Sequence, residues 1–268
     1  MRRSRQQQRQ RDERQAWEMA GASAAPFNPT DSGKVAAWLR LQASAQSAGE
    51  WTNWVDVLNS NPVAYNAARR PAVGASANAL PIATFNGATP DVGAWPLNAT
   101  NNGITHWSWG FWAQPASVSG TGNRGMAQIW TAPGGADVKK LLLYQADAAL
   151  NFLIYDSEAG GRQLTISGAL ALNTWVFIRP DWTSSRSGDD RCRVYLNGVQ
   201  ASGSYSNLGG SFPATDLRVA TGSGLFANGQ DGAANGPWSG NYGPNLYSTS
   251  SDLTTAEEAA LMNFEKPT

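Results

Sequence analysis

Cysteine, histidine and charge are scarce in this chain of 268 residues. Cys192 is its one cysteine, His106 is its one histidine, and charged residues make up 15% of the sequence. A single cysteine excludes an internal disulfide framework. One cysteine and one histidine are also too few ligands for a Cys- or His-rich zinc site. Cys192 falls in a strand pattern, so we expect a small buried hydrophobe rather than a reactive thiol.

Long apolar runs are also missing. No run reaches the length of a transmembrane helix, and residues 1–18 are polar, without the apolar stretch of a signal peptide. We therefore expect a product made in the cytoplasm, without membrane contact. The formal net charge is zero, although residues 1–20 carry six Arg against three acidic residues, which leaves about +3 there.

Common catalytic patterns are absent as well. The sequence contains no Gly-x-Ser-x-Gly elbow and no Gly-rich phosphate loop before a helix. His106 shares the face of one expected strand with Ser108, Gly110 and Trp112. A triad histidine would have to be presented in a cleft, so we expect His106 to be structural.

Tryptophan, glycine and proline are plentiful by comparison. The chain holds 12 Trp, 28 Gly and 14 Pro, and strand-sized apolar runs are separated by Gly, Asn, Ser and Pro. This pattern predicts an all-β sandwich. Strands are expected near residues 81–86, 104–114, 126–131, 139–145, 150–156, 162–167, 174–182, 190–197, 216–221 and 243–249, and residues 57–80 are expected to form a long connection.

The second half of the chain has the clearest local signals. Asn197-Gly198 supplies the positive φ angles of a tight hairpin. In the strand before it, Cys192 and Val194 face one side while Arg193 faces the other. A threonine at position 254 or 255 can cap a short helix near residues 254–264, with two glutamates in its first turn.

This ordered set resembles the C-terminal half of a laminin-G-like domain, within the concanavalin-A-like lectin/glucanase jelly rolls. That family shows a Trp-led strand, a Tyr-Leu-Asn-Gly hairpin, a strand ending in Gly and a Leu-Thr/Ser-x-x-Glu helix. The matches are Trp175 and residues 195–198, 219–222 and 253–257, and Phe85-Asn86-Gly87 resembles the family's Phe-Asp/Asn-Gly turn. The resemblance spans about residues 27–264. It implies a two-sheet antiparallel jelly-roll sandwich, a fold that hosts lectins, hydrolases and structural modules.

Related glucanases place paired acids on one strand as Glu-x-Asp-x-x-Glu. None of the seven Glu here lies two residues before an Asp in a strand pattern. Glycoside hydrolysis needs two carboxyl groups at a fixed separation, so we predict that the chain is not an enzyme. The resemblance also implies that loop residues could bind a calcium ion, here Asn86, Asp91 and Asp231. Asn and Asp residues commonly form turns, and this is the favoured explanation for them. No cofactor is therefore expected.

The chain divides into a basic N-terminal arm and linker (residues 1–25) and a jelly-roll domain (residues 26–268). The arm lacks a broad apolar stripe and cannot dock on the sandwich by itself. We expect it to anchor the protein in an assembly, and nucleic acid is a less favoured partner because no aromatics are interleaved with the Arg residues. The anchor residues are Arg2, Arg3, Arg5, Arg9, Arg11, Arg14, Trp17 and Met19.

These features lead to two functional hypotheses. The first is a non-enzymatic virion protein, a phage capsid decoration or tail-associated subunit with a lectin-like body, whose partners are other virion subunits and further copies of this chain. The alternative is a carbohydrate-binding adhesion or recognition module of a cell-surface protein. In that case Trp182, Trp238 and Tyr242, which flank turn-forming residues, are expected to stack on sugar rings.

Overall fold

The structure is a computed structural model that describes residues 29–30, 33–58, 63–65, 70–87, 93–95, 105–120, 122–130, 139–156, 160–210, 224–226 and 236–268. The predicted strand at 216–221 lies outside these residues, and so does the whole predicted arm anchor. The anchor's role therefore stays a prediction for Arg2, Arg3, Arg5, Arg9, Arg11, Arg14, Trp17 and Met19.

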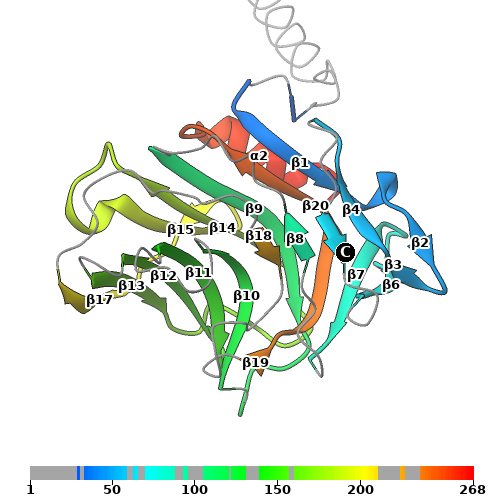
Figure 1. Cartoon of the computed structure of the whole chain (residues 1–268), viewed down its shortest axis with the longest axis horizontal. Helices are drawn as coiled ribbons and strands as arrows, with labels where there is room; N and C mark the ends of the chain where they lie inside the picture. Colours follow the sequence, from blue (N-terminus) through cyan, green and yellow to red (C-terminus); the bar gives the residue numbers. More distant parts are fainter. Residues whose placement is uncertain are drawn as a thin grey trace, which may run out of the picture.

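Two antiparallel sheets form the predicted β-sandwich (Figure 1). Sheet A contains β1 (Val35–Arg40), β2 (Gln46–Ser47), β3 (Glu50–Trp51), β4 (Asn53–Asp56), β6 (Ala72–Ala75), β7 (Pro81–Asn86), β9 (His106–Pro115), β14 (Val176–Thr183), β15 (Cys192–Leu196), β16 (Val199–Gln200) and β20 (Ser239–Thr249). Sheet B contains β5 (Val63–Tyr65), β8 (Gly93–Trp95), β10 (Asn123–Trp130), β11 (Lys139–Ala146), β12 (Ala149–Asp156), β13 (Gly160–Ile166), β17 (Ser204–Gly210), β18 (Gly224–Phe226) and β19 (Gly236–Pro237).

Strand β20 organises sheet A. One edge of β20 pairs with β9, and the other edge pairs with β7 along its first half and with β1 along its second half. The register against β9 shifts between Tyr242 and Leu246, where the chain contains Gly243 and Pro244. A Cβ on Gly243 would lie 2.7 Å from the Cβ of Trp112, so the bulge leaves no room for a side chain at this position. Strand β4 pairs with β1 in sheet A and with β5 in sheet B.

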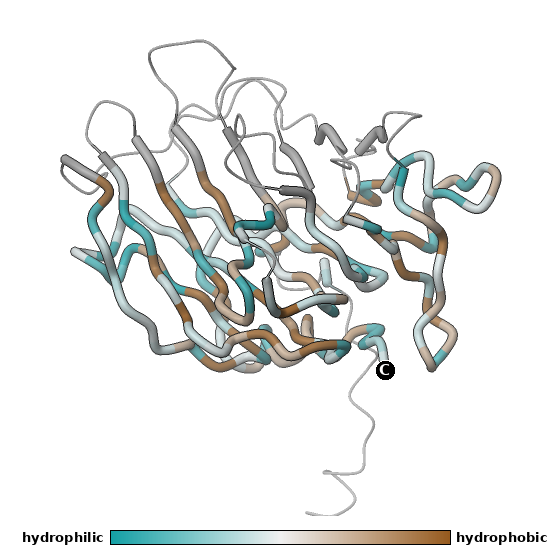
Figure 2. The backbone as a smooth tube through the Cα atoms, turned by 90° about the horizontal axis from the view of Figure 1, so that it is seen from below, coloured by the Kyte–Doolittle hydropathy of each residue, from teal (hydrophilic) through white to brown (hydrophobic). Residues whose placement is uncertain are grey.

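The core lies between the sheets and is rich in aromatic rings. On β9, the inward positions are Trp107, Trp109 and Phe111, all fully or almost fully buried. Figure 2 shows hydrophobic segments recurring along neighbouring strands. Burying each such ring removes a large apolar area from water, so the core supplies most of the driving force for folding.

The outer face of sheet A is covered by the C-terminal helix α2 (Thr255–Asn263), which lies beside β1 and β20 in Figure 1. A second buried cluster joins Trp38, Tyr247 and Leu261 across this interface. A capping box begins the helix: the Thr254 hydroxyl accepts from the Glu257 amide, and the Glu257 carboxylate accepts from the Thr254 amide. Hydrogen bonds from Lys34 and Thr254 lower the pKa of Glu257 to about 2.

Most of the predicted elements are confirmed. Strands β7, β11 and β12 match their predicted ranges within one residue, Asn197 and Gly198 have φ of 50° and 80°, and the helix begins at the predicted cap. Cys192 is buried, as expected. Two further short helices are 3-10 turns, η1 (Leu41–Ala43) and η2 (Gly188–Arg191). No described helix is long and apolar enough to cross a membrane.

Two expectations need correction. Residues 57–80 are not a plain connection, because they include β5 and β6. Strand β17 was not expected at all, since its sequence Ser-Tyr-Ser-Asn-Leu-Gly-Gly is polar and shows no apolar alternation. Among the described strands it pairs with β13. Strands at the margin of a sheet need little apolar sequence, because pairing on one side holds them in place.

Replacing Thr254 with Ala is expected to lower the free energy of unfolding by about 1 kcal/mol, because the cap of α2 is lost. Thr255→Ala, one residue further along and exposed, is the matched control and should change stability much less. Chemical denaturation of both variants measures the difference. Equal effects of the two substitutions would contradict the capping assignment.

Candidate functional site

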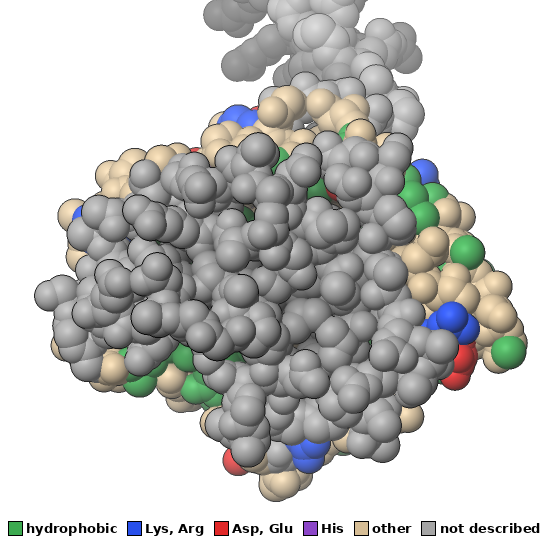
Figure 3. Space-filling view, viewed as in Figure 1, with side chains coloured by type: hydrophobic (Ala, Val, Ile, Leu, Met, Phe, Trp, Pro, Cys, Tyr) green, Lys and Arg blue, Asp and Glu red, His purple; other side chains and the backbone are tan. Residues whose placement is uncertain are grey.

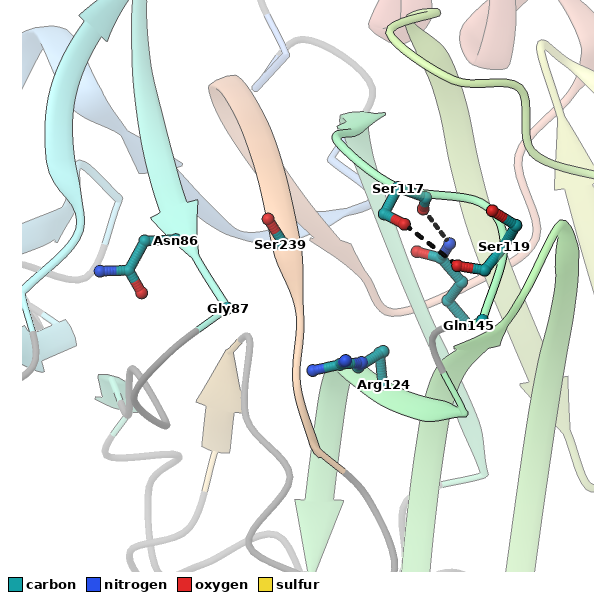
Figure 4. A pocket seen from close by; sticks show the side chains of 8 residues that line it. Asn86, Gly87, Ser117, Ser119, Arg124, Gln145 and Ser239 are labelled. Carbon is teal, nitrogen blue, oxygen red and sulfur yellow. Dashed lines mark hydrogen bonds between the residues drawn. The ribbon is translucent and has the colours of Figure 1, made fainter.

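A polar pocket opens where β7 and β9 end and β10 and β20 begin (Figure 4). It therefore receives residues from both sheets and from the connection between β9 and β10. Its volume is about 180 Å³. The lining residues are Asn86, Gly87, Ser117, Ser119, Gly120, Arg124, Gln145 and Ser239.

Glycines shape two sides of the pocket. Gly87 has φ of +71°, and a Cβ at this position would lie 2.9 Å from the Cβ of Ser239. A larger residue there would be strained and would press on the opposite wall. Gly120 and Gly122 also have positive φ, which lets the chain turn from sheet A into sheet B within a short connection.

The floor of the pocket is fixed by a buried amide. Gln145, 1% exposed, donates from Nε2 to the backbone carbonyls of Ser117 at 2.6 Å and Asp147 at 2.7 Å. Its Oε1 accepts from the indole nitrogen of Trp238 at 2.8 Å. Figure 4 shows the contact with Ser117. Because these bonds use both ends of the amide, Gln145 holds the Ser117 backbone in place and leaves ligand contacts to its neighbours.

The predicted sugar-stacking platform is wrong. Trp182, Trp238 and Tyr242 are buried, with exposed fractions of 0%, 1% and 0%. Their Gly, Asn and Pro neighbours suggested loops, but Trp182 lies in β14, and Tyr242 lies in β20 beside its bulge. Trp238 and Tyr242 stack on each other with centroids 4.8 Å apart, beneath the pocket. They support its floor from inside instead of contacting a ligand.

The residues considered for calcium are only partly described. Asn86 is exposed and lines the pocket, where its amide points away from Arg124 in Figure 4. Asp91 and Asp231 lie outside the described residues, so the calcium alternative, which the sequence did not favour, is not tested here. Sequence reasoning missed Arg124 and the three serines, because hydroxyl groups and a single arginine form no recognisable motif until the fold brings them together.

A second polar cluster lies on the outer face of sheet A, between the sheet and α2. The Arg179 guanidinium forms two hydrogen bonds with the Glu258 carboxylate, at 2.7 and 3.0 Å, and a third with the Ser108 hydroxyl at 3.2 Å. It also lies 4.0 Å from the centre of the Tyr195 ring. Arg179 and Glu258 are 3% and 4% exposed, so this pair connects the helix to the sheet through a buried ion pair.

The cluster continues towards the one histidine. Asp181 is fully buried and lies 2.6 Å from Arg186, which also pairs with Asp252. The imidazole of His106 lies between the two acids, with Nε2 3.5 Å from Asp181 and Nδ1 3.6 Å from Asp252. These three residues could in principle hold a metal ion. However, the Arg186 guanidinium already bridges the two carboxylates, so the cluster has its own cation.

Burial sets the acid–base behaviour of this region. Desolvation lowers the pKa of His106 below its ordinary value of 6.5, although Asp181 and Asp252 act in the opposite direction. Burial likewise raises the pKa of the Cys192 thiol, which makes it a poor nucleophile at neutral pH. The burial of both groups agrees with the structural roles expected for them, which stay predictions. A sequence signal was present in β14, where Arg179 and Asp181 occupy one face of an otherwise apolar strand.

Charged side chains elsewhere are mixed in sign. In the space-filling view, the described basic and acidic groups lie near each other instead of forming a patch of one sign (Figure 3). This distribution agrees with the zero net charge. Long-range attraction of a strongly charged partner to the described part of this face is therefore not favoured.

No known protein family and no curated protein matches the sequence. Solved structures do match. The receptor-binding domain of botulinum neurotoxin mosaic serotype C/D shares 10% identity and a TM-score of 0.57, over 85% of this chain and 50% of that one. The binding domain of botulinum neurotoxin DC in complex with SialylT shares 12% identity and a TM-score of 0.56, over 88% and 52%.

Trypanosoma rangeli sialidase in complex with sialic acid is also similar, with 17% identity and a TM-score of 0.54 over 90% of this chain and 34% of that one. The chain thus spans about half the length of the neurotoxin domains and about a third of the sialidase. At these identities the likeness shows the fold alone, a two-sheet β-sandwich.

Glu258→Gln should lower the free energy of unfolding by about 3–5 kcal/mol, because it leaves the Arg179 charge buried without its main partner. Glu257→Gln is the matched control on the same helix. It removes a partly exposed ion pair with Lys34 and keeps a residue suited to the capping box, so about 0–1 kcal/mol is expected. Comparable losses in denaturant titrations would refute the role of the buried pair.

Stability should fall as the pH drops from about 7 through 6.5 towards the lower folded pKa of His106. In that window the unfolded chain binds the proton more readily than the folded chain, so protonation favours unfolding. The charged groups facing the ring are Asp181 and Arg179 from β14, Arg186 from the next loop and Asp252 before α2.

Thermal melts across pH 5–8 test this expectation, with His106→Gln as the reference. The chain has one histidine, and the stabilisation from Glu257 is lost only as the pH falls from 4.5 to about 2, so the two effects occur in different pH ranges. The variant should show a flatter profile above pH 5. An unchanged profile would show that another group causes the dependence.

Proposed function

We propose that this chain is a non-enzymatic carbohydrate-recognition module whose ligand occupies the pocket between β7, β9, β10 and β20. The observation that carries the proposal is the lining itself. The lining combines the serines Ser117, Ser119 and Ser239 with an arginine and two glycines around a preformed concave site. Sugars present dense hydroxyl groups, and these are satisfied by this kind of donor and acceptor set.

The size of the pocket suits one sugar unit. Its volume of about 180 Å³ is below the roughly 300–1,000 Å³ of sites for drug-sized ligands. A single ring of a longer saccharide would fit, with the rest of the saccharide extending into solvent. The floor is rigid, since Gln145 is held by three hydrogen bonds, so little ordering of the protein opposes binding.

The similar structures support a recognition role. Two of them are binding domains of neurotoxins, one in complex with SialylT, and the third is a sialidase in complex with sialic acid. Hydrolysis by this chain is not favoured, because the described residues that line the pocket include no carboxylate. Glycosidases of the usual kind need a pair of them at a fixed separation.

The hypothesis of a phage virion subunit has less support. It depends mainly on residues 1–25, which lie outside the described residues, and the similar structures provide no support for it. Its test is separate: deletion of residues 1–22 should abolish incorporation into an assembly while the sandwich stays folded. Normal incorporation of the truncated chain would contradict the anchor.

A glycan array tests the recognition role. Ser119→Trp is expected to reduce binding at least tenfold, because the new indole fills the pocket from an exposed position that tolerates size. Ser202→Trp, an equally exposed serine that does not line the pocket, is the control and should bind normally. No binding by the unmodified chain, or equal binding by both variants, would refute the proposed site.

A further inference from the structure

We propose that β17 is an interaction edge, on which a second copy of this chain pairs and extends sheet B across a two-fold axis. Strand β17 pairs with β13 alone among the described strands. It lies at the margin of the molecule in Figure 1. The proposal goes beyond the recognition role and does not depend on it, because the residues that line the pocket include none from β17.

The outer edge of β17 offers backbone groups for pairing. In an antiparallel pair, alternate residues direct their N–H and C=O groups away from the partner strand. Within the described part of the chain, the backbone of residues 204–210 hydrogen-bonds only in its ladder with β13. Ser204, Ser206, Asn207 and Leu208 are all exposed. A neighbouring strand can therefore satisfy these backbone groups.

Strand β17 lacks the features that commonly keep a sheet edge from pairing. Natural edges are protected by charged side chains, by Pro or by a bulge. None of the residues from Ser204 to Gly210 is charged, and none is Pro. The register shift against β13 falls between Gly160 and Arg162, at one end of the ladder, so residues 204–207 pair in regular register. The edge is therefore flat where it is most exposed.

Side chains hold this edge in position. The Tyr205 hydroxyl donates to the backbone carbonyl of Cys192 at 2.9 Å. The Arg162 guanidinium donates to the Asn207 amide oxygen and lies 5.6 Å from the centre of the Tyr205 ring. An edge that is already ordered loses little conformational freedom when a partner strand binds, so less free energy opposes association.

The charges beside β17 favour a second copy as the partner. Arg162 donates from Nε to Asp189 at 2.7 Å, and Arg193 lies 3.3 Å from Asp190, so both cations have an acid within the same copy. Two such margins can meet without like-charge repulsion, and the net charge of zero adds none. An antiparallel edge is also self-complementary, because a two-fold axis brings each donor of one copy to an acceptor of the other.

The size of the contact predicts a weak dimer. Two paired strands of 7 residues extend over only about 23 Å. Such a contact belongs to the low end of protein–protein interfaces. Leu208, 40% exposed, is the large apolar side chain of β17 that it would shield. We therefore expect a dissociation constant on the order of micromolar.

Sedimentation velocity of the full chain, from low to high micromolar concentration, tests the proposal. Ser206→Lys should weaken dimerisation by about tenfold or more, because the two lysines lie opposite or diagonal to each other across the paired edges. Ser206→Glu should do the same. An equimolar mixture of the two variants should restore the dimer, since opposite charges then meet. Ser47→Lys is the control, an exposed serine in β2 on the far side of Figure 1, and should dimerise normally.

Hydrogen exchange of the unmodified chain gives a second measurement, which decides the question if a variant does not fold. The amides of residues 204–210 should become protected as the protein concentration rises. A chain that is monomeric at every concentration would overturn the proposal, even if a foreign peptide occupied the edge. A dimer that Ser206→Lys leaves intact, or that the mixed variants fail to restore, would also overturn it. Each of these failures leaves the recognition role in place.

Discussion

The pairing of β20 with β9 is the constraint on which the rest of the structure depends. The two strands form the centre of sheet A, and their inward side chains, among them Trp109, Phe111 and Tyr242, fill the middle of the sandwich. Their outer face carries Tyr247, which packs in the cluster with Leu261 of α2, and Ser108, which accepts a hydrogen bond from the Arg179 guanidinium that pairs with the helix. Loss of this pairing would separate both the core and the helix from their support.

The pocket follows from the same pairing. Near one end of β9 the chain leaves sheet A and turns into β10 of sheet B, and β20 begins beside that turn. Trp238, next to the first residue of β20, reaches Gln145 of β11 and so ties the two sheets together beneath the pocket. The recognition site is thus built at a junction that the fold already requires, and loop residues need only supply hydroxyl groups around it.

Sequence patterns predicted the fold better than the site. Alternation along β9, the Asn197-Gly198 turn and the threonine cap of α2 are local signals, since each depends on neighbours within a few residues. The burial of Trp182, Trp238 and Tyr242 depends on strand order, which local composition does not show, so loop-like neighbours misled the prediction. The pairing of Arg179 with Glu258 joins residues 79 positions apart and is equally invisible in local patterns.

Chemical-shift mapping of the labelled chain during titration with the saccharide that binds best on the glycan array is the most direct test of the central claim, that a saccharide binds at the junction of the two sheets. The account predicts that the largest shifts occur at Arg124, at Ser239 and in the connection formed by residues 117–120. Residues under α2, such as Arg179, should not respond, because they lie on the opposite side of sheet A. Largest shifts at that face, or none near Arg124, would contradict the account.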